Sequence, residues 1–406
     1  MIRADHLTAR TVLVAPNEGD SDLLAFAGDD GLLVEQEGRG LAGRGVALRV
    51  AAADAEEVLA TIRTEDEVGR SGCGPVVMGA LPFDPDAPTS LVVPRAILGR
   101  TGDGLVFRTT IGPAGEVSSD EDVRPVANPT RHPADSFTLT ATIPHREWCA
   151  IVAEAVEVIE SGKLRKVVVA REIAVEANRP ILAVDVLARL RALYPSCLLF
   201  SIDGFVGASP ELLVSRRGDQ VSSHPLAGTI PRSGDPAVDD RLGAALLESA
   251  KDREEHALVV DEVAAVLRRH CEVLDVPAGP SIVPLRNVSH LGTRISGRLG
   301  EPRPSALALA RLLHPTPAVA GTPTTDALAW IHQFERLNRG RFAGPVGWMD
   351  ARGDGDWAVG IRSAELDGHR ARLMAGVGVV ADSTPEAELA ETQLKLQALL
   401  AAIVRP

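Results

Sequence analysis

Apolar runs of strand length alternate with single helical segments in this chain, and several runs follow one another too closely for a helix to lie between them. Residues 166–175 predict a strand, residues 181–194 a helix, and residues 197–217 three further strands in quick succession. Neighbours at this spacing can form hairpins, whereas parallel neighbours need a crossover each time. The pattern therefore predicts an α/β protein of the α+β type, with large mixed, mainly antiparallel sheets and outer helices.

The N-terminal part differs from the rest in the kind and spacing of its expected elements. Residues 1–125 contain short strands separated by turns, with one helix near residues 55–63. A stretch rich in proline and polar residues, 121–136, predicts a surface connection. We therefore expect a variable N-terminal part over 1–125 and a catalytic region over 140–406, joined in one structural unit.

The C-terminal half continues the same alternation. A helix is expected over about 146–161, and two long helices over about 239–270. Three consecutive strands are expected within residues 344–380, followed by a closing helix from about Pro385. The sequence contains no internal repeat and no low-complexity block.

The net charge narrows the range of partners. At −13 over 406 residues, and without a long block of Lys or Arg, the chain argues against binding nucleic acid or an anionic membrane. The first twenty residues lack a basic region followed by an apolar run, and no apolar stretch reaches membrane-spanning length. We expect a cytoplasmic protein that acts on a small molecule, and a monomer because no extended apolar face stands out.

The four cysteines, Cys73, Cys149, Cys197 and Cys271, do not form a recognisable motif. They lie too far apart for a CxxC zinc or redox site, and their neighbours are apolar. We expect them to be reduced residues of the core.

Two pairs of acids recur at i, i+3 spacing within segments expected to be helical. Asp252 and Glu255 lie in KDREEH, and Glu388 and Glu391 lie in ELAET, so each pair shares one helix face. Each face becomes apolar further along. Two interpretations stay open: the pairs are solvated helix starts favoured by the helix dipole, or they are partly buried acids that hold a hard cation such as Mg²⁺.

Two single residues could perform acid–base chemistry. Lys166 opens an apolar strand, and it either becomes a partly desolvated amine able to act as a base or ends the strand in water. Glu211 follows the small residues of GASP, and it is either a carboxyl with a raised pKa, able to donate a proton, or an ordinary turn carboxylate.

Several further residues could bind an anionic substrate. HPLAGT (224–229) and AGVGVV (375–380) are small-residue turns whose backbone N–H groups can receive a carboxylate, and neither fits a phosphate-loop fingerprint. His314 stands in a loop stiffened by two prolines. Arg362 offers a bidentate fork to a carboxylate or forms a cross-strand salt bridge.

Taken in order, these motifs resemble those of the chorismate-utilising enzymes. The resemblance covers about residues 140–400, and it implies the fold of that family. The series reads KVVVARE, GASPELL, HPLAGT, KDREEH, HPTPAVAGTP, RGRFAGPVGW, GIRSAE, AGVGVV and ExxETxxK.

The resemblance implies roles for the acids, the lysine and the substrate-binding residues. It implies Mg²⁺ on the ring carboxylate of chorismate, held by Glu255 and Glu391 with Asp252 and Glu388 nearby or acting through water. It implies that Lys166 is the base that activates water at ring carbon 2, and that Glu211 is the acid that protonates the hydroxyl leaving carbon 4. It also implies a set of substrate-lining positions: Gly228, Thr229, His314, Arg362, Gly376 and Lys395.

Within the family, the residues near the expected pocket favour isochorismate synthase. Ala318, Val319 and Phe342 resemble the isochorismate synthases, whereas salicylate synthases resemble one another in a threonine–alanine pair and a tyrosine. Arg341 stands where a bulky ring is common. Lys166 argues against an anthranilate-type synthase, whose members tend to have glutamine there, and a non-catalytic binding protein would lack the base or the acid. The product is expected to serve menaquinone or siderophore biosynthesis.

Overall fold

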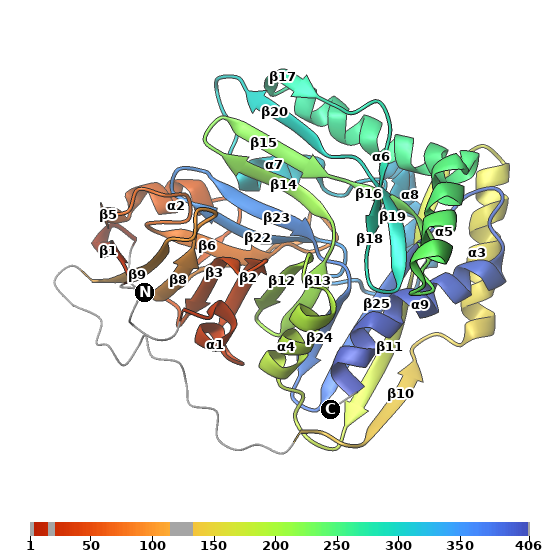
Figure 1. Cartoon of the computed structure of the whole chain (residues 1–406), viewed down its shortest axis with the longest axis horizontal. Coiled ribbons are helices and arrows are strands. Elements are labelled where there is room, and N and C mark those ends of the chain that lie inside the picture. The colour runs from red at the N-terminus through yellow and green to blue at the C-terminus, as the bar shows by residue number, and fades with distance from the viewer. Residues whose placement is uncertain (1–3, 15–20, 114–132, 405–406) are drawn as a thin grey trace.

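The computed structural model describes residues 4–14, 21–113 and 133–404, and all of its strands belong to three sheets (Figure 1). Within these residues every strand pairing is antiparallel except that of β1 with β5. The predicted α+β architecture with mainly antiparallel sheets is therefore confirmed.

The first sheet is the largest. Its order is β10 (Phe137–Ala141), β11 (Lys166–Ala177), β25 (Arg370–Val379), β24 (Ser363–Asp367), β13 (Phe205–Ser209), β12 (Leu198–Ile202), β2 (Leu32–Gln36), β3 (Arg39–Arg44), β8 (Ala96–Arg100), β9 (Val106–Pro113), β1 (Leu7–Leu13) and β5 (Arg63–Asp66), with β21 (Gly321–Thr322) paired to β11.

The second and third sheets complete the frame. The second runs β17 (Cys271–Asp275), β20 (Ile295–Leu299), β15 (Gln220–His224), β14 (Leu212–Arg217), β23 (Gly355–Val359), β22 (Pro345–Asp350), β6 (Val76–Ala80), β7 (Ser90–Val93) and β4 (Leu48–Ala51). The third is β16 (Leu226–Pro231), β19 (Val288–Gly292) and β18 (Ser281–Pro284).

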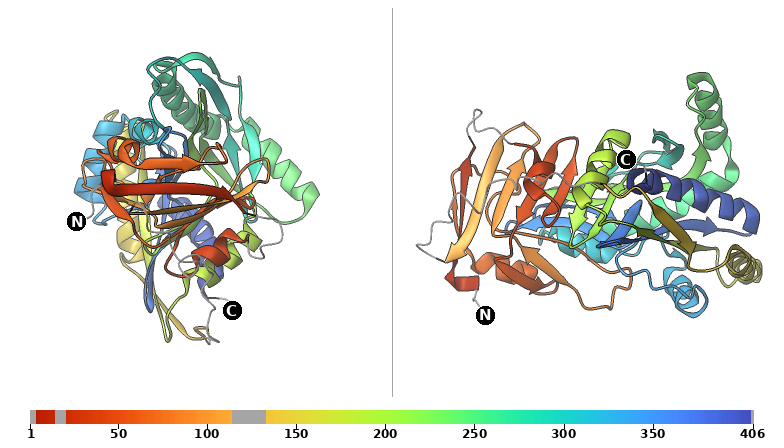
Figure 2. Two further views of the ribbon diagram at one scale, coloured as in Figure 1. Left: turned by 90° about the vertical axis from the view of Figure 1, so that its left-hand side faces the viewer. Right: turned by 90° about the horizontal axis from the view of Figure 1, so that it is seen from below.

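The helices gather mainly at the end of the molecule opposite the N-terminal strands (Figures 1 and 2). α9 packs on β25 and against α3 and α4. The helices are α1 (Leu23–Ala27), α2 (Ala55–Thr61), α3 (His145–Glu160), α4 (Ala183–Leu193), α5 (Pro236–Glu248), α6 (Ala250–Arg268), α7 (Ala306–Leu313), α8 (Thr324–Phe334) and α9 (Pro385–Val404). No described helix combines the length and the apolar character needed to span a membrane.

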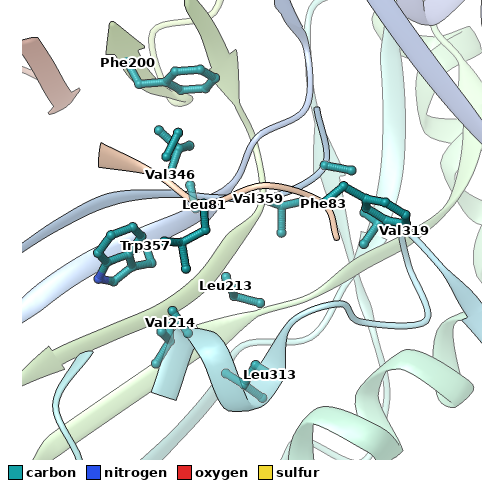
Figure 3. Packing of buried hydrophobic residues seen from close by; sticks show 14 of the residues in the cluster. Leu81, Phe83, Phe200, Leu213, Val214, Leu313, Val319, Val346, Trp357 and Val359 are labelled. Carbon is teal, nitrogen blue, oxygen red and sulfur yellow. The ribbon is translucent and has the colours of Figure 1, made fainter. Parts of the chain in front are cut away.

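The main core lies where strands of the first two sheets face one another. Phe200 of the first sheet and Val214, Val346 and Trp357 of the second belong to one buried cluster (Figure 3). Strands such as β6, β13 and β22 are buried at every residue because other layers cover both of their faces. Cys73 and Cys197 are buried, and Cys149 and Cys271 are half-buried free thiols.

Strands from before residue 114 and from after residue 132 share both large sheets. β2 pairs with β12 in the first sheet, and β6 pairs with β22 in the second. The predicted connection over 121–136 lies largely outside the described residues. The division of the chain into 1–125 and 140–406 stays a prediction.

Two apolar runs of the sequence are each divided into two strands. Residues 89–98 form β7 and the start of β8, separated at Pro94, which has no N–H to give to a ladder. Residues 356–366 form most of β23 and β24, and the chain turns between them at residues 360–362, where Arg362 has a φ of 52°.

Two of the places where the chain passes between the first two sheets are adjacent. It leaves β13 and enters β14 through Pro210 and Glu211, and it leaves β23 and enters β24 through residues 360–362. The Val359 N–H donates to the Glu211 carbonyl at 3.0 Å, and the Ala208 N–H donates to the Arg362 carbonyl at 3.1 Å. These hydrogen bonds tie the two crossings together, so Glu211 and Arg362 are held at the same junction.

Candidate active site

A cavity lies at this junction, between β11, β16 and β25 of the sheets and the first turns of α6 and α9. Every residue predicted for the site lines it except Lys166 and His314. The predicted residues that line it are Glu211, Gly228, Thr229, Asp252, Glu255, Ala318, Val319, Phe342, Arg362, Gly376, Glu388, Glu391 and Lys395.

Lys166 lies directly behind the cavity wall. Its side chain is 1% exposed, and its Nζ lies 2.8 Å from Glu255 Oε1. The wall there is Gly378, where a Cβ would stand 2.6 Å from that same oxygen and 2.7 Å from Lys166 Cε. Only glycine leaves room for the pair. Burial acts to raise the pKa of Glu255, but Lys166 above all, with Lys395 and Lys251, lowers it below its ordinary value.

Glu211 combines burial with contact to the cavity. It is 4% exposed, and burial raises its pKa from 4.5 to about 7, against the lowering effects of a hydrogen bond from the Leu226 backbone and of nearby cations. A carboxyl with such a pKa carries its proton in a large fraction of molecules at neutral pH. Glu211 can therefore donate a proton into the cavity.

The acid pairs on α6 and α9 face the same cavity. Ser249 Oγ, the N-cap of α6, donates to Asp252 at 2.5 Å, and Ser383 Oγ donates to the buried Glu388 at 2.7 Å. Burial raises the pKa of both acids, and the charge of Glu391 raises each further. The four carboxylates therefore repel one another electrostatically across a confined space.

The donor set has the chemistry expected for Mg²⁺ but not a complete protein cage. Among the described residues, no three His, Cys, Asp or Glu side chains come close enough together to hold a metal. Glu255 is paired with Lys166, and Glu391 with Lys395 at 2.7 Å. Mg²⁺ commonly takes only one or two protein carboxylates and completes its shell with water and substrate. The arrangement fits an ion held that way, and such an ion would relieve the repulsion among the acids.

Arg362 is held by a histidine that the sequence did not single out. Its Nη2 lies 3.3 Å from His290 Nε2, and His290 Nδ1 lies 3.1 Å from the Gly228 carbonyl, which can only accept. Burial and Arg362 lower the pKa of His290 to about 3, so the ring is neutral. The proton is therefore on Nδ1, and Nε2 accepts from Arg362. Thr229 Oγ1 also lies 3.1 Å from Nδ1.

His290 escaped the sequence reasoning because it is a single histidine inside a strand, a pattern without a local signal. Lys251, the exposed neighbour of Asp252, and Arg339 also line the cavity and were not predicted. Four further lining residues fall within the two small-residue segments predicted to receive a carboxylate, Leu226 and Ala227 in 224–229 and Ala375 and Gly378 in 375–380, which form largely strands β16 and β25 rather than turns. The remaining unpredicted lining residues are apolar: Val168, Pro210, Ala343, Ile361 and Met374.

His314 does not line the cavity. Its Nε2–H donates to the Phe83 carbonyl at 2.9 Å, and its ring meets the Phe83 ring edge-on with centroids 6.1 Å apart. Burial lowers its pKa to about 4, so it is neutral. The neighbouring prolines predicted a fixed imidazole, but they carried no information about the direction in which it points.

Two of the three remaining residues discussed from the sequence, Lys395 and Phe342, line the cavity, and Arg341 does not. Lys395 Nζ donates to the Gly376 carbonyl at 2.8 Å in addition to its contact with Glu391. Phe342 lines the cavity, whereas Arg341 pairs with Glu365 and does not line it. The arginine at position 341 therefore does not shape the cavity wall, whereas Phe342 does.

Comparison with known proteins agrees with this geometry. The family model described as "Chorismate binding enzyme" matches residues 45–404. The isochorismate synthase DhbC of Bacillus subtilis is 41% identical over 341 residues, which cover 81% of this chain and 81% of the relative. The vibriobactin-specific isochorismate synthase of Vibrio cholerae is 37% identical over 333 residues, covering 81% and 79%.

Two solved structures have the same fold. MenF, the menaquinone-specific isochorismate synthase from Escherichia coli, superposes with a TM-score of 0.85 at 26% identity, covering 98% of this chain and 95% of that one. The DhbC structure from Bacillus anthracis, whose title calls it a putative 2,3-dihydroxybenzoate-specific isochorismate synthase, gives a TM-score of 0.79 at 35% identity, covering 94% and 99%.

The fold, the cavity and the family model together define a chorismate-binding enzyme, and this chain belongs to that family. Within the family it is most like the isochorismate synthases. The resemblance stated from the sequence motifs is therefore confirmed.

Proposed function

We propose that this protein is an isochorismate synthase, an isomerase that moves the hydroxyl function of chorismate from ring carbon 4 to ring carbon 2. The observation that carries the proposal is the buried Glu211, which lines the cavity and has a pKa of about 7, together with Lys166, which lies behind the cavity wall and is paired with the cavity-lining Glu255. An allylic substitution by water requires an acid and a base, and this arrangement supplies both at one site.

The proposed reaction balances without any co-reactant. The oxygen of water bonds to carbon 2, the ring double bond shifts, and the bond between carbon 4 and its oxygen breaks. Lys166, as the neutral amine left once it has given up the proton of its ion pair with Glu255, takes a proton from the attacking water, and Glu211 gives one to the departing hydroxyl, which leaves as water. Because Lys166 Nζ is hydrogen-bonded to Glu255 Oε1 at 2.8 Å, the proton it gains would be shared with that carboxylate.

The cations around the cavity would receive the two carboxylates of the substrate. Arg362 would bind the enolpyruvyl carboxylate, and His290 keeps the guanidinium oriented by accepting from its Nη2. Gly228, Thr229, Gly376 and Lys395 line the cavity beside it. These local positive charges explain how a protein with a net charge of −13 can accept a dianion.

Mg²⁺ is the proposed cofactor. Glu255 and Glu391 would hold it directly, and Asp252 and Glu388 would support it through water. When bound, the ion supplies positive charge at the ring carboxylate.

The choice of isochorismate as the final product rests on the apolar part of the wall. Ala318, Val319 and Phe342 line the cavity and offer no hydroxyl there. Incubation with chorismate and Mg²⁺, followed by chromatography, should give isochorismate. Salicylate with pyruvate as the main product would overturn the proposal in favour of a salicylate synthase, and ammonia-dependent formation of an aminated product would favour an anthranilate-type enzyme.

We further propose that the enzyme works as a cytoplasmic monomer. The absence of an extended apolar face in the sequence pattern supports the monomer. Light scattering on the purified chain tests it, and a dimer mass would contradict it.

A further inference from the structure

The strand that begins with Lys166 lacks a partner strand along part of one edge. β25 pairs with β11 on one side from Val167 to Glu176. On the other side β21 pairs with Lys166 and Val167, and β10 pairs from Ile173 onward. Between these two stretches, no described strand pairs with that edge of β11.

Side chains and a loop occupy this gap in the sheet. Arg339 Nη2 donates to the Val168 carbonyl at 2.8 Å, and the Ala170 N–H donates to Glu335 Oε2 at 2.8 Å. Trp148 Nε1 donates to the Ala170 carbonyl at 2.9 Å, and the Val168 N–H donates to the Ala320 carbonyl at 2.8 Å. The buried polar groups of the strand are thus satisfied without a neighbouring strand.

Glu335 and Arg339 form a rigid unit within the gap. Arg339 Nε lies 2.7 Å from Glu335 Oε1, and Nη2 lies 2.5 Å from Oε2, in the bidentate geometry of a guanidinium on a carboxylate. Both are buried, with 1% of Glu335 and 5% of Arg339 exposed, and the guanidinium lies 4.1 Å from the centroid of the Phe83 ring. Glu335 Oε2 and the two terminal nitrogens of Arg339 also form hydrogen bonds with backbone groups.

Arg339 also reaches the loop on the far side of the gap. Its Nη1 donates to the Val319 carbonyl at 2.8 Å. Val168, Val319 and Arg339 all line the cavity, and Val168 is two residues from Lys166 and therefore on the same face of the strand. One guanidinium fixes the spacing between the Lys166 strand and the wall formed by Ala318 and Val319.

We propose that Glu335 and Arg339, here named the Glu335–Arg339 clamp, are positioning residues that hold Lys166 in register with the Ala318–Val319 wall. The inference rests on the proposed function, because it assigns the clamp to the water-activating side of that reaction. A buried ion pair adds little to stability compared with apolar residues of equal volume, and its best-attested use is to fix register.

Phe83 and His314 support the clamp from behind. Phe83 and Val319 belong to the same buried cluster (Figure 3). The Phe83 N–H donates to the Gly340 carbonyl at 2.8 Å, and its own carbonyl accepts from His314 Nε2 at 2.9 Å. His314 therefore bears on the site through Phe83 and Arg339 rather than through the substrate.

The chain supplies a matched control two residues from Arg339. Arg341 also pairs with a carboxylate, Glu365, and also donates to backbone carbonyls, those of Ile202 at 2.6 Å and Asp203 at 3.1 Å. It lies over the Phe205 ring as Arg339 lies over Phe83, but it does not line the cavity. Arg341→Lys removes the same kind of fork without touching the site.

The test compares Arg339→Lys and Glu335→Gln with Arg341→Lys in the full chain. With chorismate and Mg²⁺, the two clamp variants should lose about 10- to 100-fold in kcat while KM changes by less than about three-fold, because a small misplacement of the base costs rate rather than binding. The Arg341→Lys variant should keep kcat within about two-fold. Equal losses in all three variants, or an unchanged kcat in both clamp variants, would overturn the proposal.

The rate of amide hydrogen exchange tests, independently of activity, whether the Glu335–Arg339 clamp holds the strand. The Ala170 amide, which donates to Glu335, should exchange at least about 10-fold faster in Arg339→Lys and Glu335→Gln than in the wild type and in Arg341→Lys. Unchanged exchange would show that the clamp does not hold the strand. If the wild type made no isochorismate, the proposed function would fail, and this measurement would still decide the clamp.

Discussion

Lys166 and Glu255, expected to serve as a base and as a metal ligand respectively, form an ion pair in which Lys166 is buried and Glu255 is 15% exposed, with 2.8 Å between Nζ and Oε1. The pair joins β11 to α6, and a glycine in β25 makes the space for it. In the proposed reaction, proton transfer and metal binding are therefore coupled through a single carboxylate, and substitution of either Lys166 or Glu255 tests this coupling.

Replacing Glu255 with Gln should disturb both functions at once. Loss of the charge removes a proposed Mg²⁺ ligand and the partner of Lys166, so we expect the half-saturating Mg²⁺ concentration to rise about 10-fold or more and kcat to fall. Steady-state rates over a Mg²⁺ titration measure both. Glu254→Gln is the control, because Glu254 is its exposed neighbour and pairs with the exposed Arg165. An unchanged titration in Glu255→Gln would remove Glu255 as a ligand.

Lys166→Ala should remove the base and leave substrate binding. We expect kcat to fall by about 10²- to 10⁴-fold, the range for a positioned general base. Chorismate should still bind in the presence of Mg²⁺, and calorimetry measures this binding. The exposed Lys163, changed to Ala, serves as the control. A near-normal rate in Lys166→Ala would refute its role.

The raised pKa of Glu211 predicts a falling activity on the alkaline side. The proton donor is competent only when protonated, and its pKa in the folded protein is about 7. The profile of kcat/KM against pH should therefore decline as pH rises through about 7, because that profile reports groups of the free enzyme. A profile that stays flat from there to alkaline pH would exclude Glu211 as the required acid.

The same shift predicts how stability changes with pH. A carboxyl with a folded-state pKa raised from 4.5 to about 7 favours folding when protonated, and this contribution is lost as pH rises between those values. Above the window, ionisation of Glu211 costs about 3 kcal/mol at the usual 1.36 kcal/mol per pKa unit. Glu211→Gln removes this cost. The melting temperature of the variant minus that of the wild type should therefore increase as pH rises from 5 to 8. A constant difference would contradict the burial of an ionisable group there.

Gly378→Ala tests the crowding around the Lys166–Glu255 pair. The added methyl would lie 2.6 Å from Glu255 Oε1 and 2.7 Å from Lys166 Cε, so one partner must move. We expect a stability loss of about 1–3 kcal/mol, as for other overpacked sites, together with a loss of kcat. Gly112→Ala is the control, because a Cβ there meets no heavy atom within 4 Å. Normal kcat and stability in Gly378→Ala would show that the pair tolerates displacement.

Local sequence pattern predicted the parts of the fold that depend on local chemistry. The apolar run after Lys166 predicted a strand, and the segment from about Pro385 predicted a helix, because such patterns depend on neighbouring residues. His290 and Arg339 depend on partners more than 60 residues away, Arg362 for one and Val168 for the other, as their sequence separations of 72 and 171 show. No short window contains such pairs. The requirement for glycine at 378 likewise depends on side chains of other elements, Glu255 and Lys166.

The N-terminal strands contribute none of the described cavity-lining residues, yet they cover two long edges of the frame that holds the cavity. β2 hydrogen-bonds to β12, and β6 to β22. A chain cut back to the motif-bearing region would bare both edges, and an unprotected strand edge is a template for pairing with other chains. We therefore expect the N-terminal strands to protect the catalytic region from aggregation, although none of their described residues lines its cavity.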